Sequence, residues 1–264
     1  MAFYKALENI ELKKYSEANP ESFAVVFYSK ASLKNSSLFD KDMKQKVSTY
    51  FEDEKRTSML LSKELTGDER DILMIKDFDT KKPDHKKYKW LNNIFVGLDK
   101  YGVVAASIYA DTSSLFKNKS FVFDLAKIAE KATYRYTDTN PNTKSEAVLK
   151  TVDICVEKLN ASLGKSVELG FNVGRGANTA RNLGNRPANH ATPTYIANQV
   201  NELAKEIGGF SVEVLEEKDM KKLGMGSLLS VSEGSVEPAK LVTMQYKGGK
   251  KDAKPIVLVG KGIT

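Results

Sequence analysis

The chain has 264 residues, of which 41% are hydrophobic and 28% are charged, and its formal net charge is +7. This length and composition are typical of a globular protein with a packed core and room for two domains. No apolar run approaches the roughly 18 residues of a membrane-spanning helix, and the charged first fifteen residues do not form an export signal. We therefore expect a cytoplasmic protein with no membrane partner.

The first half of the sequence alternates short strand-like runs with helix-like ones. Strands are predicted at residues 23–28, 58–61, 72–75, 94–98 and 148–156, and helices at 41–51 and 123–136. This alternation indicates an α/β domain. Because this half contains no glycine-rich phosphate loop, no paired acidic motif and no nucleophile elbow, we expect it to serve regulation or assembly rather than catalysis.

Lysines and aromatic residues interleave in residues 81–90 (KKPDHKKYKW), the only local basic cluster of the chain. Such a pattern occurs on surfaces that bind single-stranded nucleic acid. The excess of basic residues elsewhere is spread thinly, which favours a solvated loop that leads into the strand predicted at 94–98. A nucleic-acid-binding module remains the alternative function, and it predicts an affinity that falls steeply with salt.

The sequence has one cysteine and two histidines, which limits disulfide and metal chemistry. A lone Cys155 excludes an internal disulfide, fits a reducing compartment, and is expected to pack in the core. Because His85 and His190 lie far apart in sequence, a metal site would have to use oxygen ligands and an amine rather than imidazoles. His190 is expected to occupy a loop or capping position.

Residues 161–184 allow two interpretations. Gly170, Gly174 and Gly176 could be mistaken for a dinucleotide-binding fingerprint, but the third glycine is not where that motif needs it. As one helix, the segment places small residues along one face, which favours close packing against another helix. We therefore predict an N-terminal α/β domain at 1–158, an interdomain helix at 159–185 and a second domain that begins at 186.

The last part of the sequence carries clear helix and strand signals. Thr192 is a predicted N-cap with Pro193 at the first helical position, and the amphipathic helix that follows ends before Gly208. A strand at 211–215, a helical turn at 217–223, a glycine-broken stretch at 224–235, a strand at 241–246 and a loop at 247–254 follow. The apolar run from Pro255 is predicted to be a buried central strand that delivers Lys261 between two glycines.

Four runs in this second half together resemble the leucyl aminopeptidase (cytosol aminopeptidase) family. They are residues 180–189 (ARNLGNRPAN), 223–231 (LGMGSLLSV), 246–248 (YKG) and 257–264 (VLVGKGIT). The resemblance covers about residues 160–264, while residues 1–157 match only in length and general character. Glu233 stands where the family more often has glutamine, and Pro238 lacks a neighbouring proline common there, which leaves the loop detail open.

The resemblance implies a two-metal hydrolase that removes N-terminal residues, often leucine, from peptides. Lys261 matches the lysine whose amine binds one of two divalent ions, Zn²⁺ or Mn²⁺ with Mg²⁺ as a further candidate; an exposed or anion-binding lysine is the alternative. The other ligands and the catalytic residues are expected beyond Thr264, so the 264 residues alone are predicted to be inactive. The family further implies a homohexamer, an N-terminal α/β domain similar to macro domains, and a truncated α/β/α metallopeptidase catalytic domain that begins at residue 186 and is incomplete at 264.

Overall fold

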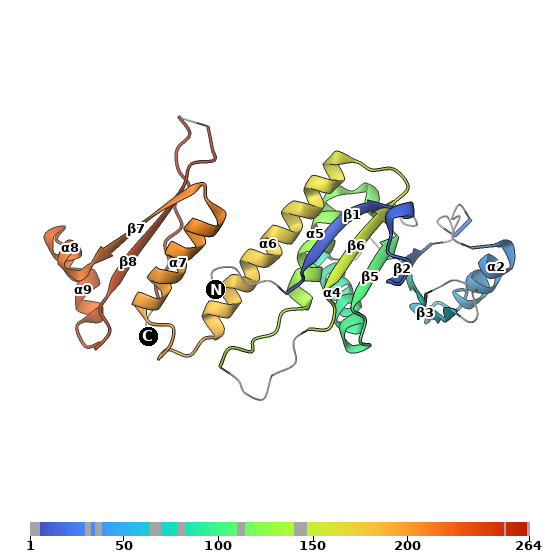
Figure 1. The fold of residues 1–264 in the computed structure, drawn as a ribbon, viewed down its shortest axis with the longest axis horizontal. Helices are drawn as coiled ribbons and strands as arrows, with labels where there is room; N and C mark the ends of the chain where they lie inside the picture. Colours follow the sequence, from blue (N-terminus) through green and yellow to red (C-terminus); the bar gives the residue numbers. More distant parts are fainter. Residues whose placement is uncertain are drawn as a thin grey trace. The chain divides into compact units, whose positions relative to one another are not determined.

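The computed structural model describes residues 6–29, 33–34, 39–63, 70–78, 83–109, 114–139, 147–250 and 252–262. The chain divides into two compact units (Figure 1). The larger unit comprises Lys5–Thr137 and Asn142–Asn178, and the smaller unit comprises Thr179–Thr264 with Met1–Tyr4 and Asp138–Pro141. No helix among the described residues is both long enough and apolar enough to cross a membrane.

The larger unit is built on a six-stranded sheet with the strand order β1-β6-β5-β2-β4-β3. All neighbouring strands are parallel except β3, which pairs antiparallel with β4. The strands are β1 (Asn9–Lys14), β2 (Phe23–Tyr28), β3 (Ser58–Leu61), β4 (Ile72–Lys76), β5 (Ala105–Tyr109) and β6 (Thr151–Val156). The α/β fold class is thereby confirmed, with β1 and β5 as strands that the sequence did not predict.

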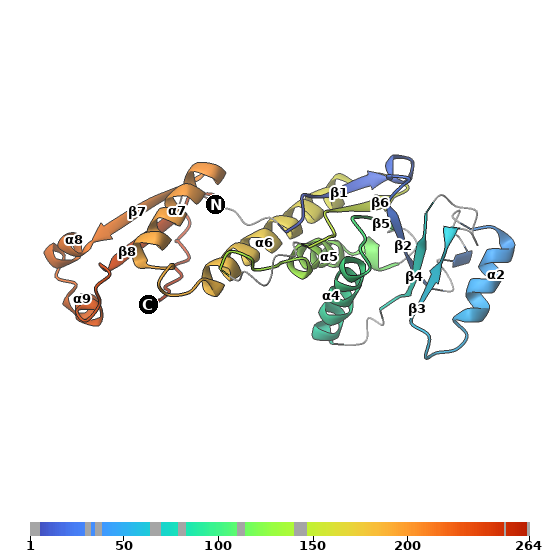
Figure 2. The same cartoon turned by 60° about the horizontal axis from the view of Figure 1, so that its bottom comes forward.

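Helices cover both faces of this sheet (Figure 2). One core packs α4 (Asp84–Lys100), α5 (Lys119–Ala132) and the first part of α6 (Ala161–Asn185) against the sheet. The second core lies on the other face and involves α2 (Lys41–Tyr50), through Val47. Two 3₁₀ turns, η1 (Tyr15–Glu17) and η3 (Ser114–Lys117), complete the described elements of this unit. The helices predicted at 41–51 and 123–136 correspond to α2 and α5, and α5 begins four residues earlier because Asn118 caps it.

The strand predicted at 94–98 is wrong, because these residues lie within α4. Leu91, Ile94, Phe95 and Leu98 are buried on one side of that helix, at the spacing of an amphipathic helix. A short apolar run cannot by itself distinguish a buried strand from a buried helical segment. The loop predicted for the basic cluster is wrong for the same reason: residues 84–90 form the start of α4, and residues 81–82 lie outside the described part of the chain.

Close packing between α6 and α5 confirms the single-helix interpretation of residues 161–184. A Cβ atom at Gly170 would lie 2.2 Å from the carbonyl oxygen of Phe123, and a Cβ atom at Gly174 would lie 2.9 Å from the carbonyl oxygen of Lys127. Both oxygens belong to the backbone of α5, so any larger residue would force the two helices apart. The glycines therefore serve helix packing and not phosphate binding.

The smaller unit contains a two-stranded antiparallel sheet of β7 (Phe210–Glu216) and β8 (Lys240–Tyr246). The predicted amphipathic helix is α7 (Pro193–Ile207), and the Thr192 hydroxyl accepts a hydrogen bond from the Tyr195 backbone N–H at 3.2 Å. The predicted helical turn is α8 (Glu217–Lys222). The glycine-broken stretch contains one more helix, α9 (Gly226–Ser232), which the sequence did not predict.

Candidate metal centre and surface pocket

The segment that carries Lys261 is not the buried strand that the sequence predicts. Ile256, Val257, Leu258 and Val259 are 92%, 72%, 93% and 93% exposed, and residues 252–262 contain no strand. A buried strand needs neighbouring strands to satisfy its backbone N–H and C=O groups. The only strands described in the smaller unit are β7 and β8, and neither pairs with this segment. Residues 263–264 lie outside the described part of the chain.

The described residues do not by themselves form a metal site. Lys261 is exposed, and the described part of the chain contains no cluster of three or more histidine, cysteine, aspartate or glutamate residues with suitable geometry. Divalent ions such as Zn²⁺ and Mn²⁺ need several ligands, and carboxylates and imidazoles are their usual donors. A single exposed amine cannot hold such an ion without further ligands, so the metal-binding role of Lys261 stays a prediction.

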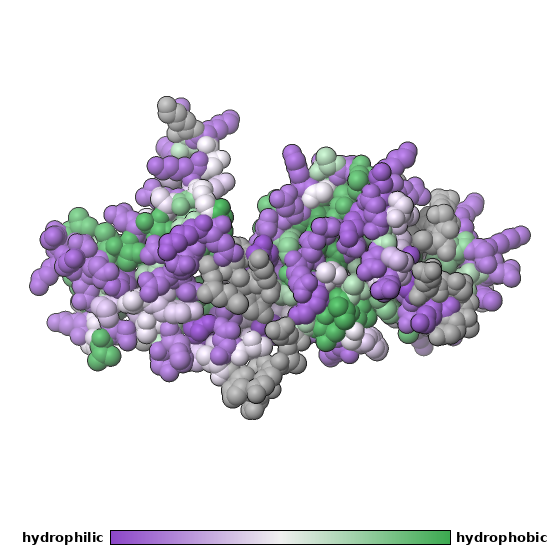
Figure 3. Space-filling view, in the orientation of Figure 1, coloured by the Kyte–Doolittle hydropathy of each residue, from purple (hydrophilic) through white to green (hydrophobic). Residues whose placement is uncertain are grey.

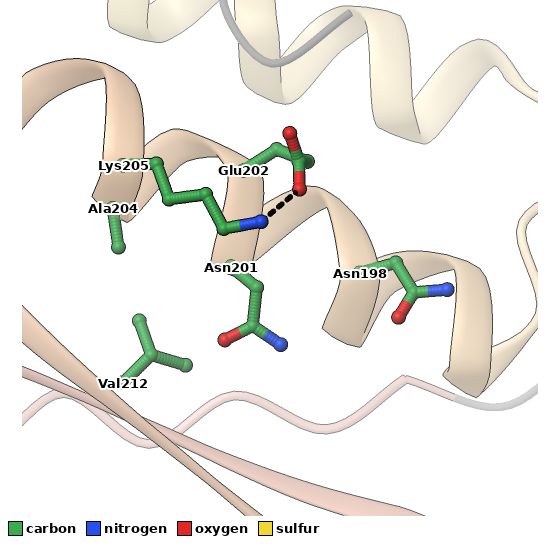
Figure 4. Close-up of a pocket in the computed structure, with 6 residues that line it drawn as sticks. All are labelled: Asn198, Asn201, Glu202, Ala204, Lys205 and Val212. Atoms are coloured by element: carbon green, nitrogen blue, oxygen red, sulfur yellow. Dashed lines mark hydrogen bonds and ion pairs between the residues drawn. The ribbon is translucent and has the colours of Figure 1, made fainter.

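A depression of about 520 Å³ lies in the smaller unit between α7 and β7. Its lining residues are Asn198, Asn201, Glu202, Ala204, Lys205 and Val212 (Figure 4). Lys205 donates to Glu202 across 2.7 Å, and this hydrogen bond lowers the pKa of the exposed Glu202 carboxyl. The lining therefore offers two amides and one ion pair, which can form hydrogen bonds but do not supply an acid and base pair for catalysis.

The sequence patterns did not lead us to predict this depression, although its lining residues have a recognisable spacing. Asn198, Asn201, Glu202 and Lys205 recur at helical spacing and form the polar face of α7. A polar helix face is ordinarily a solvated surface, so the spacing alone does not indicate a site.

The other two candidate residues, Cys155 and His190, lie in a buried strand and in a turn, respectively. Cys155 is fully buried, as predicted, and burial raises the pKa of its thiol to about 11. His190 lies in an exposed turn, where its backbone N–H donates to the Pro187 carbonyl oxygen at 2.9 Å. Cys155 thus packs in the core and His190 occupies a turn, as the sequence predicts.

The basic cluster does not present a free row of cations. The Lys87 amine lies 2.8 Å from the Asp124 carboxylate of α5 and 3.3 Å from Asp84. Hydrophilic side chains dominate the face shown in Figure 3, with acidic and basic residues both abundant in the chain. The local positive charge at the start of α4 is therefore partly neutralised by its own neighbours.

Comparison with known proteins identifies relatives of the second half of the chain. Residues 178–264 match the cytosol aminopeptidase family, catalytic domain. A probable cytosol aminopeptidase of Thioalkalivibrio sulfidiphilus is 56% identical over 99 residues, which are 38% of this chain and 20% of the relative. A probable cytosol aminopeptidase of Nitrosococcus oceani is 41% identical over 143 residues, which are 53% of this chain and 28% of the relative.

The fold is similar to solved leucine aminopeptidases. A tomato leucine aminopeptidase mutant matches with a TM-score of 0.69 at 14% identity, over 93% of this chain and 52% of that protein. The apo leucyl aminopeptidase of Trypanosoma cruzi matches with a TM-score of 0.62 at 15% identity, over 93% of this chain and 49% of that protein. The chain thus spans about half the length of these structures, and the matches named here give no support to nucleic-acid binding.

The sequence match falls on residues 178–264, which include all four of the runs that resemble the family. Residues 178–264 are thus similar to the catalytic domain of the cytosol aminopeptidase family.

Proposed function

We propose that this chain is part of a metal-dependent aminopeptidase that hydrolyses the N-terminal peptide bond of peptides, often after leucine. The observation that carries the proposal is the match of residues 178–264 to the catalytic domain of the family. The names of the matched relatives and solved structures support the same activity. We further propose cytoplasmic localisation, peptide substrates and a homohexameric assembly, which the family resemblance implies.

Within this activity Lys261 is proposed to supply one ligand to one of two divalent ions, Zn²⁺ or Mn²⁺ or else Mg²⁺. A lysine amine binds a metal only when it is neutral, because the protonated amine has no free electron pair. When bound, such ions polarise a carbonyl group and activate a water molecule. Gly260 and Gly262 lack side chains, so the backbone beside Lys261 leaves room for other ligands to approach.

The remaining ligands are proposed to come from the part of the family's length that these residues do not span. The proposed division is an N-terminal domain at 1–158, an interdomain helix at 159–185 and part of a catalytic domain at 186–264. Because the described residues do not complete a metal site, the 264-residue chain alone is expected to be inactive.

Hydrolysis of leucine p-nitroanilide tests the proposal. The 264-residue chain is compared with a chimera in which the remaining catalytic domain of the Thioalkalivibrio sulfidiphilus relative follows Thr264 in register. Release of p-nitroaniline is expected from the chimera only in the presence of Mn²⁺ or Zn²⁺, and none from the chain alone.

Two substitutions in the chimera test the role of Lys261. Lys261→Met removes the amine and is expected to abolish hydrolysis and to weaken metal retention during dialysis. Lys254→Met changes an exposed lysine of the preceding loop and should leave both unchanged. Full activity of Lys261→Met would contradict the ligand role, and a folded chimera that is inert with every metal would contradict the proposed function.

A further inference from the structure

Three segments of the larger unit meet at one buried carboxylate, that of Glu130 on α5. Glu130 is 0% exposed. Its Oε1 accepts a hydrogen bond from the backbone N–H of Ala6 at 2.9 Å, and its Oε2 accepts one from the backbone N–H of Leu7 at 2.8 Å. The side-chain amide of Asn178 on α6 donates to Oε1 at 3.1 Å. One carboxylate therefore links α5 to α6 and to the segment that leads into β1.

The Asn178 amide also binds the backbone of α5. Its Nδ2 donates to the Glu130 carbonyl oxygen at 2.8 Å, and the same oxygen accepts from the Thr133 hydroxyl at 3.1 Å. Glu130 lies in the last turn of α5, where carbonyl groups have no partner within the helix. Asn178 is 0% exposed and is the last residue of α6 in the larger unit. One side chain therefore completes the end of α5 and holds the carboxylate.

A carboxylate at this position costs stability unless N–H groups bind it. It is buried, and it lies at the carboxyl end of α5, where the helix dipole disfavours negative charge. Burial raises the pKa of the Glu130 carboxyl, and the three N–H donors act against that effect. Each donor that leaves would therefore make the remaining buried carboxylate less stable.

The close approach of α6 leaves little room for water to replace a lost donor. A Cβ atom at Gly174 would lie 2.9 Å from Cβ and 3.0 Å from Cγ of Glu130, closer than side chains normally pack. Water can reach the carboxylate only if α6 or residues 6–7 move away from α5. Loss of one attachment therefore favours loosening of the other.

We propose that Glu130 couples the docking of residues 6–7 to the anchoring of residues 174–178 of α6, so that release of either segment makes release of the other easier. The two segments share one acceptor, and a carboxylate that has lost one donor gains by opening to water on the other side. Because such coupling is reciprocal, each segment must respond to a change in the other. This inference does not depend on the proposed peptidase activity.

Amide hydrogen exchange of the 264-residue chain, measured residue by residue by NMR, tests the coupling. Ala6→Pro removes one N–H donor to Glu130 and leaves the sequence of α6 unchanged. The amides of residues 174–178 should then exchange about tenfold faster, as expected when a hydrogen bond to a charged group is lost. The amides of Leu91 and Phe95, buried on α4 of the same unit, should accelerate far less. Equal acceleration of both sets would show general destabilisation and would contradict the coupling.

Asn178→Ala makes the reciprocal change and decides the question if Ala6→Pro fails to fold. It removes the donor on α6 and should accelerate exchange of the Leu7 amide by a similar factor. Glu8→Pro is the matched control for Ala6→Pro, because the Glu8 N–H donates to the Lys150 carbonyl oxygen at 2.8 Å. It removes a hydrogen bond of the same segment and should leave the amides of residues 174–178 at their wild-type rates.

A double-mutant cycle in urea unfolding gives an independent measurement. Trp90, the only tryptophan, lies on α4 and reports unfolding of the larger unit by fluorescence. The loss of unfolding free energy in Ala6→Pro with Asn178→Ala should be smaller than the sum of the two single losses, because either substitution already breaks the coupling. The losses of Glu8→Pro and Asn178→Ala should add. Additive losses for the first pair, or an unchanged exchange rate of the Leu7 amide in Asn178→Ala, would overturn the proposal.

Discussion

Replacing Gly170 with alanine tests how closely α6 and α5 pack in the larger unit. The added Cβ atom would lie 2.2 Å from the carbonyl oxygen and 3.0 Å from the carbonyl carbon of Phe123. It would also lie 3.1 Å from Cβ of Ala126. The oxygen is part of the α5 backbone and cannot rotate away as a flexible side chain would, so the two helices must separate.

The expected change in the free energy of unfolding is the balance of two opposing effects. Overpacking a close contact typically costs about 1–3 kcal/mol. Alanine gains about 0.5–1 kcal/mol over glycine within a helix because the unfolded chain loses less backbone freedom. Since a contact of 2.2 Å to backbone lies at the severe end, we expect Gly170→Ala to lower the free energy of unfolding by roughly 1–2 kcal/mol.

The matched control is Gly176→Ala in the same helix. A Cβ atom at Gly176 would meet no atom within 4 Å, so only the helix gain of about 0.5–1 kcal/mol should remain. The same glycine-to-alanine substitution, made at positions 170 and 176 of one helix, should therefore change the free energy of unfolding in opposite directions.

The assay is urea unfolding followed by the fluorescence of Trp90, with linear extrapolation to water. With a urea slope of about 2 kcal/mol per molar, Gly170→Ala should lower the unfolding midpoint by roughly 0.5–1 M. Equal stability of Gly170→Ala and the wild type, or equal effects of the two substitutions, would refute the packing described for α6 and α5.

Two further predictions concern buried groups of the larger unit. Asp99→Ala should lower the free energy of unfolding by about 3 kcal/mol, measured by urea unfolding. The Asp99 carboxylate accepts hydrogen bonds from the backbone N–H groups of Val148 and Leu149 at 2.6 and 3.0 Å, and it lies 2.6 Å from the Arg135 guanidinium. A loss below about 0.5 kcal/mol would contradict this role. Cys155 should not react with a thiol reagent at pH 8 until the chain unfolds. The side chain is buried, and its pKa is raised to about 11, so almost no thiolate exists at that pH. Rapid labelling of the folded chain would contradict this prediction.

Local signals in the sequence predicted several elements well. Thr192 and Pro193 mark the start of α7, and Gly208, with a positive φ of 69°, marks its end. These residues act through their own backbone preferences and hydrogen bonds, which do not depend on distant parts of the chain. The same holds for β2, whose continuous apolar run is typical of a strand buried on both faces.

Tertiary contacts explain the elements that the sequence patterns did not predict or predicted wrongly. Half of the residues of the edge strand β1 (NIELKK) are charged, and the strand is held by parallel pairing with β6 and by the hydrogen bonds that Glu130 accepts from the residues before it. The apolar run of α4 suits either a strand or a helix, and packing against α5 and the sheet accompanies the helical form. The apolar run at 256–259 suits a strand equally well but has no described strand beside it.

The sequence by itself determined the α/β class, the positions of α6 and α7, and the resemblance of residues 178–264 to the cytosol aminopeptidase family, because these depend on periodicity, capping residues and short motifs. Only the tertiary structure decided which glycines of α6 touch α5, that Glu130 is sealed at the junction of three segments, and that Lys261 has no carboxylate cluster around it among the described residues. The physical reason is that burial and close contact join residues more than a hundred positions apart, such as Leu7 and Glu130, and no local pattern encodes such a distance.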